Sequence, residues 1–278
     1  MKITVGLPSR NRPAGLVSVL TALDALASGL HEITYAVIVD DDDSTTPRHL
    51  LPQNAHILSG PREKLVAARF NEAMEAFPAD MYMQACDDSF PLAFKWDVLL
   101  HGARELPAFS WQECNDPANA TYPVISERWR KAVGRFYPEY FPFWFADTWI
   151  AEVYNLAFAK PIGVVNQLQM GGKRGQTQSM RDLEFWFDFF AATRVERIAE
   201  AVAVAKAFGF SLNVEKDRQN ELQRMKAGDT YQKGRIALYE GALGAGNEPL
   251  EVYINAKRKA EEWLKLQLQD TEVLSAAV

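Results

Sequence analysis

The sequence has little cysteine, no long apolar run and no excess of positive charge, and each of these features excludes a class of protein. Cys86 and Cys114 are the only cysteines among the 278 residues. They could form one disulfide bond at most, so a fold held together by several disulfides is excluded. So low a cysteine content is typical of a protein from a reducing compartment. No apolar run approaches the roughly 18 residues that span a bilayer. The chain enters a strand directly after Met1, so no signal peptide is expected. These features predict a soluble, cytoplasmic protein.

The net charge and the composition indicate an ordinary globular protein rather than one that binds nucleic acid non-specifically. The net charge of −6 argues against a non-specific grip on nucleic acid, because that grip needs a basic face. Basic residues do gather at 128–135 and 173–181, so the net charge does not exclude a local basic groove. Hydrophobic residues make up 48% and charged residues 24%, which is an ordinary composition for a globular protein. A chain of this length can form a stable hydrophobic core without disulfides or structural metals.

Apolar runs and helical spacings alternate through the first third of the chain. Strands are expected at 2–7, 34–39, 55–58 and 80–85. Helices are expected at 63–77 and where Leu16, Leu20, Leu23 and Ala27 recur, closed by Gly29. This order predicts an α/β fold, with a mostly parallel sheet that helices cover on both faces.

The rest of the chain predicts an irregular aromatic region followed by helices. Residues 106–146 show little periodicity; helices are then expected at 147–159, 182–192, 194–208, 214–227, 230–243 and 249–268. We predict a nucleotide-binding and catalytic domain over 1–192, with its acceptor side at about 106–192, and a helical C-terminal extension over 193–278. The extension packs on the domain, forms a homodimer surface or docks an acceptor partner; the sequence does not decide which.

Polar clusters follow three of the expected strands. The first strand leads into Pro8–Arg12, the second into Asp40–Asp43, and the fourth into Asp87–Asp88. Ligands of open parallel sheets bind beyond these strand ends, and so many acids repel one another unless a cation joins them. Mg²⁺ or Mn²⁺ bridging a diphosphate fits, since it takes one or two carboxylates plus phosphate oxygens and water. The alternative for Asp40–Asp43 is a set of turn and helix-cap residues.

Four segments in this order resemble the nucleotide-binding half of a family 2 glycosyltransferase with a GT-A fold. They are Val5–Asn11, the strand ending at Asp40-Asp41 before Ser44-Thr45, the helix segment Ala67–Ala73, and the strand Asp80–Asp88. The resemblance covers the first third of the chain and fades after about residue 100. It implies a GT-A Rossmann-like α/β domain that binds a nucleotide-diphosphate sugar.

The resemblance also implies roles for the residues after the first two strands. Pro8, Ser9 and Arg10 match the loop that lines the nucleotide pocket. Asp40 or Asp41 matches the acid that reads the base, which is usually uracil. A UDP-linked donor is therefore expected.

The resemblance places the diphosphate and the metal at the later segments. Arg69 and Asn71 match helix residues beside the diphosphate; the alternative for Arg69 is a solvated helix face. Asp87-Asp88 matches the family's Asp-x-Asp-type motif, but has adjacent acids preceded by Cys86. This match assigns Asp88 to Mn²⁺ or Mg²⁺, and Asp87 to the ribose or to a metal-bound water.

A general base is also needed if the anomeric centre is inverted, because the acceptor hydroxyl must lose its proton. Asp147, which follows an aromatic run and opens an expected helix, is the candidate for this catalytic residue, with Glu152 as the fallback. The alternative is that Asp147 caps the helix 148–159, and one residue can do both.

The metal site lacks a histidine that many relatives have after this helix. All four histidines lie earlier: His31, His49, His56 and His101. Asn166 or Gln167 replaces that histidine, or the metal has no third protein ligand, or there is no metal. Lys173 and Arg174, flanked by glycines, are expected to close over the phosphates, and the alternative is an ordinary basic turn.

Aromatic residues of the middle region are acceptor-site candidates as a group, because sugars and bases stack on aromatic faces. They are Phe109, Trp111, Tyr122, Trp129, Trp144 and Trp149. For any single one of them, core packing is the favoured alternative.

The leading hypothesis is a metal-dependent glycosyltransferase that moves a sugar to an acceptor hydroxyl. The acceptor stays open among glycan, protein, lipid-linked sugar and modified nucleic acid; no basic amphipathic anchor favours a membrane. A nucleotidylyltransferase on the same fold is the second hypothesis, disfavoured because the first loop has no glycine run. A degenerate, non-catalytic binding or assembly module is the third.

Overall fold

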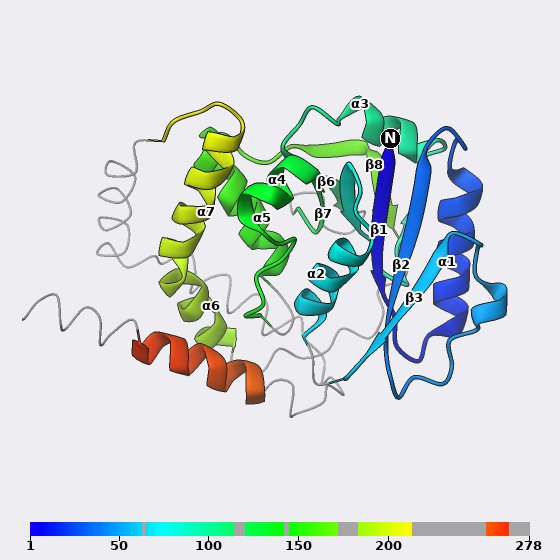
Figure 1. Ribbon diagram of the computed structural model, residues 1–278, viewed down its shortest axis with the longest axis horizontal. Helices are drawn as coiled ribbons and strands as arrows, with labels where there is room; N and C mark the ends of the chain where they lie inside the picture. Colours follow the sequence, from blue (N-terminus) through cyan, green and yellow to red (C-terminus); the bar gives the residue numbers. More distant parts are fainter. Residues whose placement is uncertain (63–64, 114–119, 142–144, 172–182, 213–253, 267–278) are drawn as a thin grey trace, which may run out of the picture.

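The computed structural model describes residues 1–62, 65–113, 120–141, 145–171, 183–212 and 254–266 (Figure 1). The helices expected at 214–227 and 230–243 lie outside these ranges, as do Lys173, Arg174 and Trp144. Among the residues described, no helix combines the length and the apolar character needed to cross a bilayer.

The strands form one sheet of eight, in the order β3-β2-β1-β4-β7-β6-β8-β5. Their bounds are β1 Lys2–Pro8, β2 Glu32–Asp40, β3 Ala55–Gly60, β4 Met81–Gln84, β5 Phe90–Pro91, β6 Ala108–Glu113, β7 Tyr122–Ser126 and β8 Val164–Gly171. Strands β3, β2, β1 and β4 are parallel, and so are β6 and β8. Strand β7 runs antiparallel to β4 and β6. The predicted mostly parallel α/β sheet is confirmed.

Helices cover both faces of the sheet, as predicted (Figure 1). They are α1 Pro13–Leu26, α2 Val66–Ala76, α3 Trp96–Gly102, α4 Glu127–Val133, α5 Ala146–Phe158, α6 Leu183–Ala192 and α7 Arg194–Ala207, with the 3₁₀-helix η1 at Arg48–Leu50. Residues 254–266 are helical in all described positions. Helices α1 and α3 share one core with the sheet. Helices α2, α4, α5, α6 and α7 share the other.

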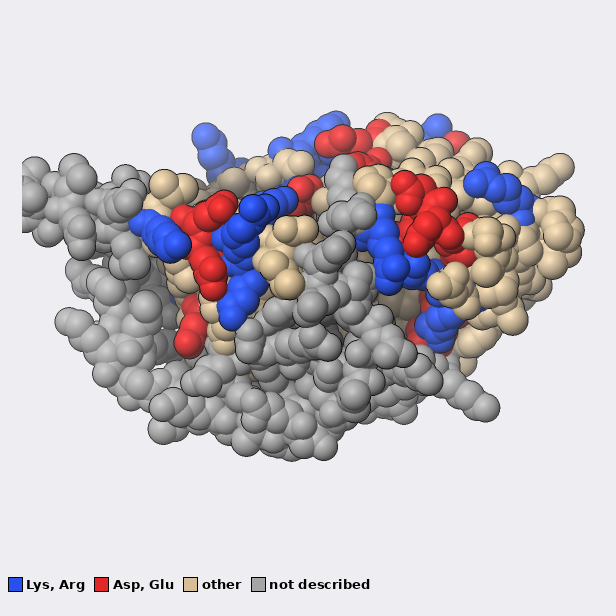
Figure 2. All heavy atoms as spheres, turned by 90° about the horizontal axis from the view of Figure 1, so that it is seen from below, with Lys and Arg blue, Asp and Glu red and all other residues tan. Residues whose placement is uncertain are grey.

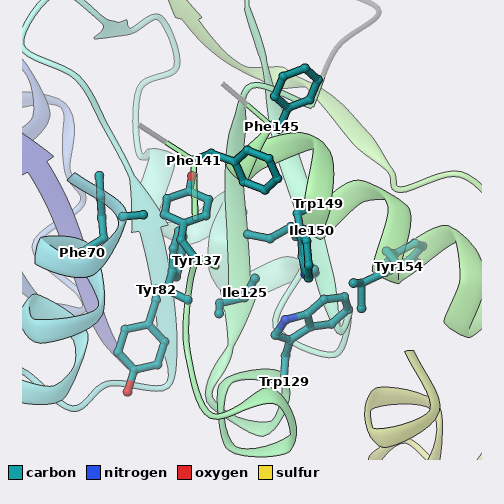
Figure 3. Close-up of a cluster of buried hydrophobic side chains, with 14 of the residues drawn as sticks. Phe70, Tyr82, Ile125, Trp129, Tyr137, Phe141, Phe145, Trp149, Ile150 and Tyr154 are labelled. Carbon is teal, nitrogen blue, oxygen red and sulfur yellow. The ribbon is translucent and has the colours of Figure 1, made fainter. Parts of the chain in front are cut away.

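The second core is largely aromatic and contains most of the middle region (Figure 3). Phe70 from α2, Tyr137 and Phe141 from the segment after α4, and Trp149 from α5 all pack there. The middle region also holds β6, β7 and α4, which the sequence did not predict. All five residues of β7 are buried, so this strand lacks the alternation by which a half-buried strand is recognised.

The described part of the C-terminal extension packs on this same core. Helix α7 contributes Ala201, Val204 and Ala205, and the helical segment 254–266 contributes Ala256 and Ala260. Of the three expectations for the extension, packing on the domain is therefore met by these residues. The boundary between 192 and 193 as a domain division stays a prediction.

Candidate functional site

The candidate site lies where the chain reverses its direction of travel across the sheet. From β1 the chain moves outward to β2 and β3, and then returns to the other side of β1 to form β4. In open α/β sheets the carboxyl ends of strands diverge at such a point and leave a ligand crevice. The loops after β1 and β4 meet there, since the Ser9 hydroxyl donates to Asp87 Oδ2 at 2.7 Å.

Two tight turns with the same layout flank the loop after β1. The Asp43 amide donates to the Asp40 carbonyl at 3.1 Å after β2, and the Ser89 amide donates to the Cys86 carbonyl at 3.1 Å after β4. The two central residues of each turn are aspartates: 41 and 42 in the first, 87 and 88 in the second. We call these the β2 acid turn (40–43) and the β4 acid turn (86–89).

Each acid turn is paired with one arginine of the intervening loop. Arg10 donates to Asp40 and, through both terminal nitrogens, to Asp42 at 2.6 and 2.9 Å. Arg12 lies 2.5 Å from Asp87 Oδ1 and 3.3 Å from Asp88 Oδ2. Figure 2, which looks onto the lower edge of the molecule in Figure 1, shows acidic and basic side chains side by side on this face. Arginines therefore supply part of the cationic charge that the acids require.

The two turns differ in how far they bury their acids. The hydrogen bond from Arg10 lowers the pKa of Asp42. Burial raises the pKa of Asp87, which is 5% exposed, and the Ser9 hydrogen bond and the Arg12 charge offset only part of that rise. The Asp88 side chain is 24% exposed. Of the β4 pair, Asp88 is thus the carboxylate that faces solvent, which is the geometry that its predicted metal role requires.

The start of α1 is pressed against the β4 acid turn. Pro13 occupies the first turn of α1, where its fixed φ and missing N–H suit a helix start. Gly15 follows in the same turn, and a Cβ at this position would lie 2.6 Å from the carbonyl oxygen of Asp87. The absence of a side chain at Gly15 therefore sets the distance between Arg12 and the acids it pairs with.

Replacing Gly15 with alanine is expected to destabilise the protein by about 1–3 kcal/mol, the usual cost of forcing a methyl group into a packed site. Gly102→Ala is the matched control, because a Cβ there meets nothing within 4 Å. Urea unfolding of both variants measures the difference. Equal stability of the two variants would contradict the close approach at Gly15.

Arg69 lies at the same edge of the sheet, beyond β3. Its guanidinium donates to the Leu58 carbonyl at 2.9 Å, pairs with Glu72, and occupies the space that a side chain at Gly60 would take. Arg69 is 9% exposed, so the alternative of a solvated helix face is wrong. Its predicted contact with a diphosphate stays a prediction.

Asn71 holds the segment between α4 and α5. Its side-chain oxygen accepts from the amides of Phe136 and Tyr137, each at 2.9 Å. Its amide nitrogen donates to the Tyr137 carbonyl at 2.9 Å and to Glu139 at 2.8 Å. Because an Asn side chain has two N–H donors and both are used, the observed role of Asn71 is to fix this segment against α2.

The same segment brings the chain toward Asp147. The Tyr137 hydroxyl donates to Gln84, the last residue of β4. Burial raises the pKa of Tyr137 well above its usual value, and the negative charge of Asp147 adds to the rise. The charge of Asp147 therefore acts on the residue that contacts the end of β4.

The alternative reading of Asp147 as a helix cap is wrong. Helix α5 begins at Ala146, and its N-cap is Phe145 with φ +74°. Asp147 lies within the first turn, where its Oδ1 accepts from the Thr148 amide at 2.8 Å. The fallback base, Glu152, pairs with Arg194 and with Arg197 Nε at 2.8 Å, so its carboxylate joins α5 to α7.

The remaining sequence candidates divide between the core and the residues not described. Five of the aromatic candidates are buried, which confirms their core-packing alternative: Phe109, Trp111, Tyr122, Trp129 and Trp149. Asn166 and Gln167 lie in β8, with side chains outside the described set. Within the ranges given above, no three His, Cys, Asp or Glu residues are grouped to hold a metal ion.

The sequence drew attention to the acids but not to their pairing. The sequence places Arg12 in the segment after the first strand but gives it no partner, and it gives no role to Arg62, which lies 3.9 Å from Asp42. The available signal was position: Arg10 and Arg12 sit between two Asp-Asp pairs in the spatial order of the strands. That order is set by the crossover to β4, which is a tertiary feature.

Comparison with known proteins defines the class of fold. No protein-family model matches the chain, and no curated protein sequence is similar to it. Mannosyltransferase PcManGT from Pyrobaculum calidifontis, solved with GDP-Man and Mn²⁺, is 12% identical, with 96% of this chain and 84% of that chain covered and a TM-score of 0.52.

Two further solved structures are similar to the same extent. Glucosyl-3-phosphoglycerate synthase from Mycobacterium tuberculosis, with Mn²⁺, UDP-glucose and glycerol 3-phosphate, is 15% identical, with 71% and 80% of the two chains covered and a TM-score of 0.52. S. aureus TarS 1-349 with UDP-GlcNAc is 14% identical, with 76% and 74% covered and a TM-score of 0.51. The predicted GT-A Rossmann-like fold is thereby confirmed.

Proposed function

We propose that this protein is a metal-dependent glycosyltransferase that moves a sugar from a nucleotide-diphosphate donor to an acceptor hydroxyl. The observation that carries the proposal is the pair of acid turns joined by Arg10 and Arg12 at the crossover point of the sheet. In support of the proposal, carboxylates that suit a cation and guanidinium groups that suit phosphates lie at the same edge of the sheet. The solved structures of the same fold contain UDP- or GDP-linked sugars and Mn²⁺, which supports the choice of donor.

The donor is proposed to lie across the loop after β1. Pro8, Ser9 and Arg10 line the nucleotide, and Asp40 or Asp41 accepts from the base. Asp41 suits base recognition, because its backbone amide is fixed to the Gly60 carbonyl at 2.8 Å while its side chain is exposed. A UDP-linked sugar is the proposed donor. Arg69, Lys173 and Arg174 are proposed to neutralise its phosphates.

The residues present fit a divalent cation that binds together with a diphosphate. Asp88 offers one partly exposed carboxylate, and the described residues hold no three-ligand cluster that would bind a cation without help. Mg²⁺ and Mn²⁺ need only one or two carboxylates when phosphate oxygens and water complete their shell. Asp88 is the proposed ligand, and Asp87 is proposed to hold the ribose or a water of the cation. The cation would neutralise the charge of the departing diphosphate.

The transfer is proposed to invert the anomeric carbon. Asp147 accepts the proton of the acceptor hydroxyl while the acceptor oxygen bonds to the anomeric carbon. The bond from that carbon to the phosphate oxygen breaks, and the nucleoside diphosphate leaves with the electron pair. In support of this role, the charge of Asp147 acts on Tyr137, whose hydroxyl donates to Gln84 at the end of β4.

The acceptor is proposed to be a hydroxyl compound from one of four classes: glycan, protein, lipid-linked sugar or modified nucleic acid. A cytoplasmic location and a homodimer formed through the C-terminal helices stay predictions, and the comparisons give the dimer no support.

Binding of UDP or GDP with Mn²⁺ tests the proposal. A nucleotide at about 100 times its Kd stabilises a protein by roughly 2.7 kcal/mol, so thermal unfolding should shift upward by several degrees. The shift should require Mn²⁺ and disappear in Asp88→Asn. Slow release of UDP from a UDP-sugar without acceptor would support transfer chemistry. Pyrophosphate release from a nucleoside triphosphate would support a nucleotidylyltransferase instead, and no shift with any nucleotide would overturn both.

A further inference from the structure

Arg12 pairs with the carboxylates that are proposed to bind the divalent cation. Its guanidinium pairs with both acids of the β4 acid turn, at 2.5 Å from Asp87 and 3.3 Å from Asp88. Asp87 also accepts from Ser9, and Gly15 holds the start of α1 against the same turn. The backbone that carries Arg12 is thus held close to the β4 acid turn, and Asp87 is held by Ser9 as well as by Arg12.

We propose that Arg12 and the divalent cation compete for the β4 acid turn, so that the chain binds the cation tightly only together with a nucleoside diphosphate. The inference rests on the proposed function and adds the order and coupling of its two ligands. The diphosphate brings negative charge into the crevice and becomes the new partner of Arg12. Arg12 therefore passes from the acids to the phosphates when the donor binds.

The physical reason is charge balance. A guanidinium and a divalent cation on one carboxylate repel each other, and among the described residues no third His, Cys, Asp or Glu joins Asp87 and Asp88 in a group that could hold the cation. Arg12 is the suitable partner for both states, because a planar guanidinium binds carboxylate and phosphate groups equally well through paired N–H donors. Its side chain is 42% exposed, so it can turn toward a ligand without breaking the core.

Arg10 provides a matched comparison. It belongs to the same loop and carries the same charge, but it pairs with Asp40 and Asp42 of the β2 acid turn. Removing Arg10 therefore removes an equal charge without freeing the β4 acids. Arg12→Lys keeps the charge at position 12 and serves as the conservative variant.

The experiment is a Mn²⁺ titration of the full chain, read by the electron paramagnetic resonance signal of free Mn²⁺, with and without saturating UDP. Wild type should bind Mn²⁺ weakly alone and at least about tenfold more tightly with UDP. Arg12→Gln should bind Mn²⁺ alone about tenfold more tightly than wild type, the scale of repulsion between such charges at a solvated site. Saturating UDP should increase the Mn²⁺ affinity of Arg12→Gln by a smaller factor than it increases that of wild type. In the titration without UDP, the Mn²⁺ affinities of Arg10→Gln and Arg12→Lys should stay within about threefold of that of wild type.

Each other outcome is decisive. A rise in Mn²⁺ affinity cannot come from structural damage, which would lower it. Unchanged or weaker Mn²⁺ binding by Arg12→Gln, with UDP still bound by wild type, overturns the competition and leaves the proposed function standing. Equal Mn²⁺ affinity of wild type with and without bound UDP overturns it as well, even if the variant fails to fold. Absence of any nucleotide binding to wild type overturns the proposed function itself.

Discussion

Asp147→Asn is expected to lower the kcat of sugar transfer by about 10²–10⁴-fold, the range that a positioned general base contributes. Asparagine keeps the size of the side chain and can still accept the hydrogen bond from the Thr148 amide, so α5 should start as before. The KM for the nucleotide sugar should change little, because the donor is proposed to bind at the loop after β1. Steady-state kinetics with a UDP-sugar and a hydroxyl acceptor give both constants.

The control for this change is Asp80→Asn. Like Asp147, Asp80 accepts from a backbone amide, that of Lys2, but it directly precedes β4 and so lies at the opposite edge of the sheet from the acid turns. The Asp80→Asn variant should therefore have the same kcat as wild type. If Asp147→Asn retained most of its kcat, or raised KM alone, Asp147 would not be the base.

Asp88→Asn is expected to abolish the Mn²⁺-dependent part of nucleotide binding and to lower transfer by at least about 10²-fold, the scale of losing one electrostatic stabiliser of the transition state. An amide oxygen lacks the charge that holds a hard cation. Because the Asp88 side chain is partly exposed, the fold should persist, and the loss should appear in calorimetric titration with UDP and Mn²⁺.

Asp87→Asn is the variant that distinguishes loss of cation binding from structural disruption of the β4 acid turn. Asp87 is buried and bonded to both Ser9 and Arg12, so its replacement should lower the free energy of unfolding more than that of Asp88. Metal-dependent UDP binding by Asp88→Asn equal to wild type would contradict the role of Asp88.

The first half of the sheet could be predicted because local signals agreed there. Strands β1 and β2 are apolar runs bounded by Pro8 and by the aspartates after Val39. Helix α1 has a buried stripe at Leu16, Val19, Leu20 and Leu23, which is the spacing of an amphipathic helix. For α1 the helical period of the buried stripe was sufficient. For β1 and β2, which are buried along almost their whole length, a continuous apolar run bounded by turn residues was sufficient.

The second half of the sheet could not be predicted in the same way. Strand β7 is buried on both faces, and β8 pairs with strands that precede it by more than 50 residues. Pairing of this kind depends on which segments meet in space rather than on the period of either one. The aromatic acceptor-site candidates of this region are instead core residues: Trp129 and Trp149 pack in the core that contains α5, and Phe109, Trp111 and Tyr122 pack in the core on the side of α1 and α3.

By itself, the sequence determined the order of the strands and helices from β1 to β4, and with it the presence of acids at the ends of β2 and β4. Those features are local, because a strand end and the turn residues after it are encoded next to each other. Only the tertiary structure decided that Arg10 and Arg12 each pair with a different acid turn, that Asn71 fixes the segment before Asp147, and that Phe145 caps α5. The pairing of Arg12 with the β4 acid turn follows from the crossover that places β4 beside β1. The contact of Asn71 with Phe136 likewise joins residues that are 65 positions apart, and such a separation along the chain carries no signal that the residues meet.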